Sequence, residues 1–162
     1  MRAPKPPRPK PDAFGKALSL LARREQSRRE LGDKLKRGGY APAEVEGALD
    51  GVVERGYQDD ARFAAVLARS RAASGYGPRR IAAELRSHGL DPTTVASALA
   101  DVEADWLDNA RRQMERRYGR KPAVESAERA RRAGFLLRRG FDAATVSALT
   151  RAECGDPDDD FD

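Results

Sequence analysis

An internal repeat with a period of about fifty residues constrains the fold of this chain more than any other feature. Eight positions of the first copy are Leu31, Leu35, Gly39, Tyr40, Pro42, Val45, Ala48 and Leu49. Their counterparts in the second copy are Ile81, Leu85, Gly89, Leu90, Pro92, Val95, Ala98 and Leu99. Because a unit of this size buries little apolar surface alone, we expect successive units to share contacts.

A third copy is weaker and follows the second at an offset of about fifty-one residues. It contains Leu136, Gly140, Phe141 and Val146 where the second copy has Leu85, Gly89, Leu90 and Val95. In this copy Arg132 stands at the position of Ile81, Ala143 replaces the proline, and Leu149 falls one place early. The third unit is therefore either a divergent copy or one whose alignment is imperfect.

The apolar residues within each unit recur at helical spacing, and glycine or proline residues separate the stripes. Only 13 residues are Val, Ile or Thr, against 28 alanines, which disfavours a large sheet. We predict an all-α fold of three tandem three-helix repeats over residues 13–56, 57–103 and 104–153. We also predict disordered tails, one basic and proline-rich at 1–12 and one acidic at 154–162. In the third unit, Pro122 is expected to begin a long helix that ends near Arg139.

The net charge of +5 is unevenly distributed. Residues 1–11 contain four basic and no acidic residues, and residues 152–162 contain six acidic and no basic residues, so the body between them is strongly positive. A positive body indicates an anionic partner such as nucleic acid, although a solvated arginine-rich surface explains the composition equally well. The single Cys154 excludes an intramolecular disulfide, and no apolar run approaches the length of a membrane span, so we expect a cytoplasmic protein without a membrane partner.

Signals for an enzyme are poor. The one histidine, His88, precedes a helix-ending glycine and suits a helix C-terminus better than catalysis. Asp59 and Asp60, with Glu54, allow a metal-nuclease reading, but adjacent acids before an apolar helix are more simply N-caps. No phosphate-binding loop of the Walker type is present. We expect no catalytic residue, no cofactor and no metal ion.

The candidate binding residues are arginines at the starts of helices. Arg79 and Arg80 follow Gly77 and Pro78 in a first turn, where positive charge opposes the helix dipole but creates an anion site from free amides and guanidinium groups. The corresponding residues of the other two units are Arg28 and Arg29, and Arg129 and Arg131. Regular stacking would align the three first turns into a basic stripe. The alternative is that these arginines only pair with Glu84, Glu30 or Glu128.

Further candidates flank these turns. Arg69 and Arg71 end the preceding helix, Arg111, Arg112, Arg116 and Arg117 form a second basic face, and Tyr76 lies beside a basic cluster. Tyr76 and Tyr118 could stack on bases, although such tyrosines more often pack between repeats.

Several ordered segments resemble the RecX family, the bacterial regulators of the RecA recombinase. These are Gly56-Tyr57, Asp59-Asp60, Arg62-Phe63-Ala64, Arg69-Ser70-Arg71, Gly75 to Ile81 with Glu84-Leu85, and Gly134 to Phe141. The resemblance covers roughly residues 14–149. It implies three three-helix repeats in an elongated, curved molecule, which we expect to be a monomer. It also implies a non-enzymatic regulator that binds RecA–single-stranded-DNA filaments and inhibits recombination in DNA repair and the SOS response.

Two other functions stay open. Helix-turn-helix-like units could bind DNA directly, weakly and without sequence preference. An all-α repeat scaffold for an unrelated protein partner also agrees with the composition.

Overall fold

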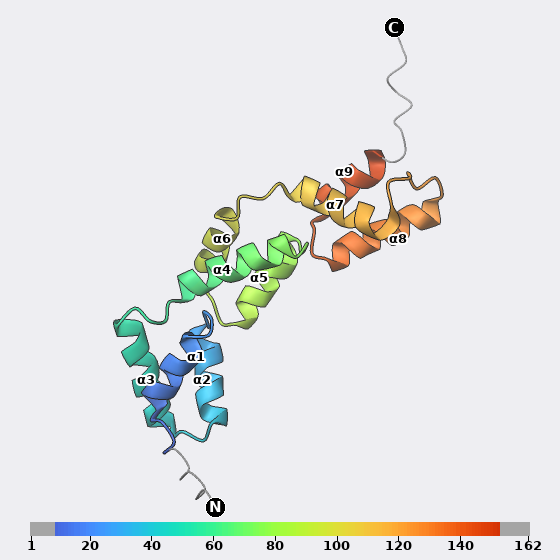
Figure 1. Cartoon of the computed structure of the whole chain (residues 1–162). Coiled ribbons are helices and arrows are strands. Elements are labelled where there is room, and N and C mark those ends of the chain that lie inside the picture. Colours follow the sequence, from blue (N-terminus) through green and yellow to red (C-terminus); the bar gives the residue numbers. More distant parts are fainter. Residues whose placement is uncertain (1–8, 153–162) are drawn as a thin grey trace, which may run out of the picture. The chain divides into compact units, whose positions relative to one another are not determined.

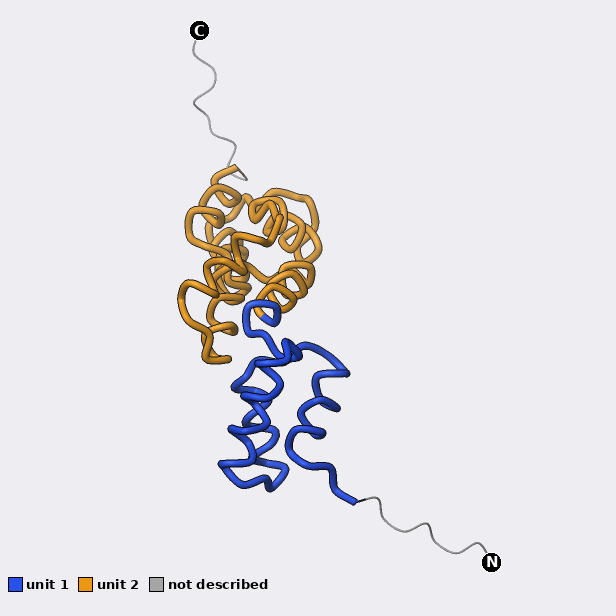
Figure 2. The backbone as a smooth tube through the Cα atoms, turned by 90° about the vertical axis from the view of Figure 1, so that its left-hand side faces the viewer, with its two compact units in different colours: residues 1–63 blue, residues 64–162 orange. Residues whose placement is uncertain are grey.

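The computed structural model describes residues 9–152, and within this range the chain forms nine α-helices and no strand (Figure 1). The helices are α1 (Ala13–Leu21), α2 (Arg28–Arg37), α3 (Pro42–Glu54), α4 (Asp60–Ala73), α5 (Pro78–Ser87), α6 (Pro92–Ala100), α7 (Trp106–Tyr118), α8 (Ser126–Arg138) and α9 (Ala143–Ala152). The predicted all-α fold is confirmed. The chain divides into two compact units, residues 1–63 and 64–162, with the boundary inside α4 (Figure 2).

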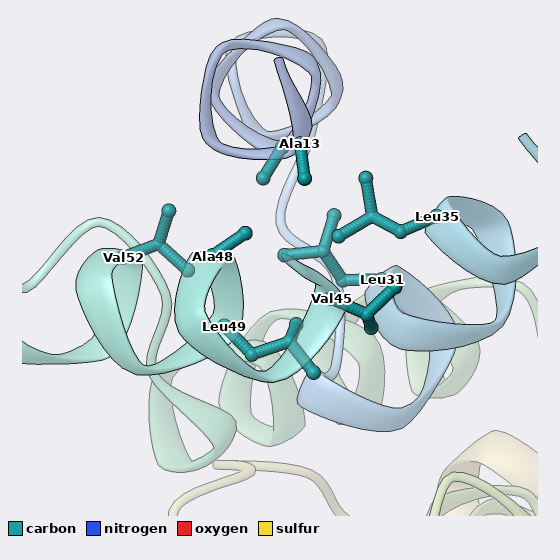
Figure 3. Close-up of a cluster of buried hydrophobic side chains, with 8 residues drawn as sticks. Ala13, Leu31, Leu35, Val45, Ala48, Leu49 and Val52 are labelled. Atoms are coloured by element: carbon teal, nitrogen blue, oxygen red, sulfur yellow. The ribbon is translucent and has the colours of Figure 1, made fainter. Parts of the chain in front are cut away.

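The first unit is a bundle of α1, α2 and α3 around one small core. Figure 3 shows its side chains converging from the three helices: Ala13, Leu31, Leu35, Val45, Ala48, Leu49 and Val52. Leu31, Leu35, Val45 and Val52 have no exposed surface. Each apolar stripe seen in the sequence therefore faces this core, and its burial stabilises the bundle by about 25 cal/mol per Å² of apolar surface.

Polar contacts attach the start of α4 to the same unit. Asp60 Oδ1 accepts from the backbone amide of Arg28 at 2.8 Å and from Gln58 Nε2 at 2.8 Å. Arg62 Nε lies 2.5 Å from Glu25 Oε1. Because Asp60 supplies the acceptor for an amide in the first turn of α2, this helix start is capped from a distant part of the chain.

Side chains that cap helix N-termini mark two of the helix boundaries, as the sequence predicts. Asp91 Oδ1 accepts from the amide of Thr94 at 2.9 Å, and Asp142 Oδ1 accepts from the amide of Thr145 at 2.7 Å, as N-caps do. Hydrogen bonds from these threonines hold the pKa values of both carboxyl groups below their ordinary range.

The glycines that end the second helix of each repeat share one conformation. Gly39, Gly89 and Gly140 have φ values of +82°, +79° and +92°, in the left-handed region that favours glycine. The predicted correspondence of the three units therefore holds at the level of the backbone.

The third repeat is a genuine but divergent copy. Arg132 occupies the position of Ile81 and is only 2% exposed. Its guanidinium group pairs with Glu128 at 2.5 Å and donates to the carbonyl of Lys121 at 3.0 Å. The ring of Tyr118 lies 5.3 Å from the same group. A buried guanidinium group requires such partners, whereas the apolar Ile81 at the same position of the second repeat requires none.

The helices of the third repeat enclose a second core of Ala110, Met114, Leu136, Phe141, Val146 and Leu149. The prediction that Pro122 begins the long helix is wrong, because α8 begins at Ser126. Arg129 Nη1 donates to the carbonyls of Ala123 and Val124 at 3.3 and 2.6 Å. These carbonyls are thus bonded to a side chain, and the loop stays outside the helix.

The predicted tails fall largely outside the described residues, which exclude 1–8 and 153–162. Within the predicted tail 1–12, the last residues instead contact the first unit. Lys10 Nζ donates to the carbonyl of Gly38 at 2.6 Å and lies 4.1 Å from the centre of the Tyr40 ring. Asp12 caps α1. In the range 9–152, no helix is both long and apolar enough to cross a bilayer.

Candidate functional site

Two turns meet backbone to backbone inside the second unit, and we call this junction the seam. It joins the α4–α5 turn, residues 74–77, to the α8–α9 turn, residues 139–141 (Figure 1). The amide of Gly77 donates to the carbonyl of Arg139 at 2.8 Å, and the amide of Arg79 donates to the carbonyl of Gly140 at 3.0 Å. A Cβ atom on Gly77 would lie 2.4 Å from the carbonyl carbon of Gly140, so only glycine permits this approach.

The seam corrects the prediction of an anion site with free amides at the start of α5. The amides of Gly77 and Arg79 already donate to carbonyls of the α8–α9 turn. In the first unit, the amide of Arg28 likewise donates to Asp60. These amides are therefore not available to an external anion.

Tyr76 lies in the seam between two arginines. The guanidinium carbon of Arg80 is 4.5 Å, and that of Arg139 5.1 Å, from the centre of its ring. Arg139 Nη1 also donates to the carbonyl of Ser74 at 3.3 Å. Cation–π contacts of this kind contribute about 0.5–1 kcal/mol each at exposed sites. Tyr76 thus packs between repeats and holds both cations at the surface.

The end of α7 adds two more cations beside this junction. Arg116 and Arg117 line a cleft of about 360 Å³, whose other lining residues are Ser74, Gln113, Phe135 and Arg139. We name the four arginines of this region the seam surface: Arg80, Arg116, Arg117 and Arg139. None of them has a carboxylate within 4.0 Å among the residues that the structure describes.

Arg71 differs from these four, because its charge is compensated. Its guanidinium group binds Glu84 through two hydrogen bonds of 2.8 and 2.7 Å. This pair raises the pKa of Arg71 and lowers the pKa of Glu84. The expected partner Glu84 is therefore occupied by Arg71, which leaves Arg79 and Arg80 without an ion pair in the described chain.

The remaining predicted residues lie apart from the seam surface. Arg28 pairs with Glu46 and Asp50 of α3 at 3.1 and 2.8 Å. Arg111 and Arg112 both pair with Asp108, at 3.6 and 3.3 Å. These charges are matched locally and are less available to a partner.

The predicted stripe of three basic first turns does not form within the second unit. The first turn of α5 meets the end of α8, whereas Arg129 and Arg131 belong to its beginning, about 15 Å away along the helix. Arg69 and Arg29 are exposed and have no ion pair among residues 9–152, and Arg69 lines a separate cleft of about 650 Å³ that also contains Asp101 and Glu103.

Arg139 is a member of the seam surface that the sequence analysis did not single out. The only signal was its place in the segment Gly134 to Phe141, because its proximity to Tyr76 depends on how two repeats pack. In the described part of the chain, no group of three His, Cys, Asp or Glu residues is placed to hold a metal ion.

Comparison with known proteins gives one consistent family. Models of the RecX first, second and third three-helix domains match residues 13–50, 59–99 and 103–149. Regulatory protein RecX of Xanthomonas oryzae pv. oryzae strain PXO99A is 45% identical over 141 residues, which cover 87% of each chain. The protein of the same name from Stenotrophomonas maltophilia strain R551-3 is 45% identical over 144 residues, covering 89% of this chain and 86% of the relative.

Solved structures agree at the level of the fold. The crystal structure of RecX from Lactobacillus salivarius superimposes with a TM-score of 0.72 and covers 87% of this chain and 94% of its own. At 18% sequence identity, this likeness supports the architecture of three-helix repeats alone.

Proposed function

Because this chain belongs to the RecX family of regulatory proteins, we propose that it binds RecA–single-stranded-DNA filaments and inhibits the recombinase. We propose further that it acts as a cytoplasmic monomer, by binding rather than by catalysis, in recombination, repair and the SOS response. The observation that supports a binding role is the seam surface, where four guanidinium groups have no carboxylate partner in the described chain.

The chemistry of the seam surface suits a filament that carries phosphate groups. Guanidinium groups bind phosphate oxygens through paired hydrogen bonds, and they stay charged at any physiological pH. Contacts of this kind position a protein on nucleic acid without reading its sequence. Binding should therefore be independent of DNA sequence and should weaken steeply as salt increases.

The test removes two charges that have no ion pair among residues 9–152. Arg116 and Arg117 are exposed, and the variant Arg116→Gln, Arg117→Gln should inhibit RecA-catalysed strand exchange less than the parent protein does. The matched control is Arg23→Gln, Arg37→Gln, which removes two exposed charges from the first unit. An equal loss of inhibition in both variants would show that total charge matters, and undiminished inhibition by the seam variant would show that the seam surface does not dock.

The second candidate function is direct binding of naked DNA, which the same uncompensated arginines favour. The two functions differ in their preferred partner. A regulator of the filament should bind RecA-coated single strands more tightly than bare strands at equal salt, whereas a DNA-binding module should prefer the bare strands. Fluorescence anisotropy of a labelled oligonucleotide, with and without RecA, separates them.

A further inference from the structure

The seam surface concentrates like charges whose neighbouring acids are already engaged. Glu84 binds Arg71, Glu115 lies 3.3 Å from Arg120, and Asp142 caps α9. Guanidinium groups gathered around one junction repel each other, and a polyanion bound there relieves that repulsion.

The chain itself contains a segment with the complementary charge. Residues 153–162 include six acidic residues and no basic residue: Glu153, Asp156, Asp158, Asp159, Asp160 and Asp162. This segment follows α9 directly, and α9 begins at Ala143, two residues after the seam. A helix of 10 residues spans about 15 Å. An extended chain covers about 3.3 Å per residue, so the aspartates at 158–160 have the length to return to the seam.

We propose that the acidic segment 153–162 binds the seam surface in cis and competes there with external polyanions. A short tether gives the segment an effective concentration in the millimolar range. The apparent affinity of an external anion then equals its affinity for the uncovered surface multiplied by the fraction of time for which the surface is uncovered. The segment would thus favour ligands that offer many phosphate groups at once. This inference rests on the proposed role of the seam surface as an anion-binding face, and its first test does not require any partner.

The first test compares the full chain with a chain that lacks residues 153–162. Arginine Nε–Hε resonances of Arg116, Arg117 and Arg139 should shift between the two proteins at 20 mM NaCl and coincide at 500 mM NaCl, because salt screens the attraction. Full-length protein with Asp156, Asp158, Asp159, Asp160 and Asp162 replaced by Asn should resemble the truncated chain. Coincident resonances at low salt would overturn the proposal, as would shifts confined to Arg111 and Arg112.

The second test measures competition with a labelled oligothymidine. If the segment covers the surface for nine-tenths of the time at 20 mM NaCl, its removal should tighten binding about tenfold, and the gain should vanish at 500 mM NaCl. The control Asp33→Asn, Glu54→Gln neutralises two exposed acids of the first unit and should leave the affinity within about twofold of the parent. Unchanged affinity on removal of the segment would contradict competition. If neither protein binds the oligonucleotide, bare or coated with RecA, while the resonances still shift, the proposed function fails and the intramolecular contact stands.

Discussion

Replacing Gly77 by alanine should open the seam, because a side chain there has no room. Gly77 has φ −84°, which alanine adopts without strain, so the conflict is purely between atoms. A Cβ atom would meet the carbonyl carbon of Gly140 at 2.4 Å, the amide nitrogen of Phe141 at 2.4 Å and the carbonyl oxygen of Gly140 at 2.5 Å. All three atoms belong to the backbone, so no side-chain rotation relieves the overlap.

The expected loss of stability follows from the contacts that the seam contains. Separation of the turns breaks the hydrogen bonds from the amides of Gly77 and Arg79, each worth about 0.5–1.5 kcal/mol. It also removes Arg139 from the ring of Tyr76, at about 0.5–1 kcal/mol. We therefore expect Gly77→Ala to destabilise the second unit by about 1.5–4 kcal/mol, which lowers its melting temperature by roughly 6 °C or more.

Hydrogen exchange of the Arg79 amide and thermal unfolding followed by circular dichroism test this expectation. The control is Gly47→Ala, because a Cβ atom at that exposed position in α3 meets nothing within 4 Å. Alanine is favoured over glycine inside a helix by about 0.5–1 kcal/mol, so the control should be slightly more stable than the parent. If Gly77→Ala melts within a degree of the parent and its Arg79 amide exchanges equally slowly, the seam contributes nothing to stability.

Three further predictions concern charged residues. Arg79→Glu, Arg80→Glu should weaken inhibition of RecA while shifting the melting temperature by only a few degrees, since acids suit a helix start; normal inhibition with a clearly lower melting temperature would assign both arginines a structural role. The ion pair with Arg71 lowers the pKa of Glu84, so the pair contributes about 0.5–1 kcal/mol to the free energy of unfolding above the ordinary glutamate pKa near 4.3. This contribution is lost as the pH falls through the lowered pKa, and Glu84→Gln should remove that part of the pH dependence of stability in urea titrations. Arg132→Ala should destabilise the chain by about 3–5 kcal/mol, whereas the exposed Arg131→Ala should change it by less than about 0.5 kcal/mol, and equal effects would contradict the buried role of Arg132.

The sequence predicted the helices because their signals are local. Apolar spacing, N-caps such as Asp91, and glycines such as Gly89 act within a few residues of their own position. The start of α8 could not be predicted in the same way. Pro122 suits the first turn of a helix, but the guanidinium group of Arg129 binds the carbonyls of Ala123 and Val124 and keeps this segment in a loop.

The candidate site depended on packing that residue spacing does not encode. The sequence indicated basic clusters around Arg80 and Arg116, more than thirty residues apart, without showing that they share a surface. Their proximity follows from the close approach of Gly77 and Gly140, which belong to different repeats. The sequence singles out the motif around Gly77, but the reason for a glycine at this position is the carbonyl group of Gly140, which leaves no room for a Cβ atom.

The two junctions of the chain should respond differently to the solution. Main-chain amides and carbonyls form the seam at Gly77, and these groups neither titrate nor respond strongly to ionic strength. Carboxylates of Asp60 and Glu25 hold the start of α4, and salt screens this attachment. In concentrated salt, the start of α4 should therefore loosen from the start of α2 and from the α1–α2 turn, while the second and third repeats stay joined. A change in ionic strength would therefore weaken the attachment of the start of α4 and leave the seam intact.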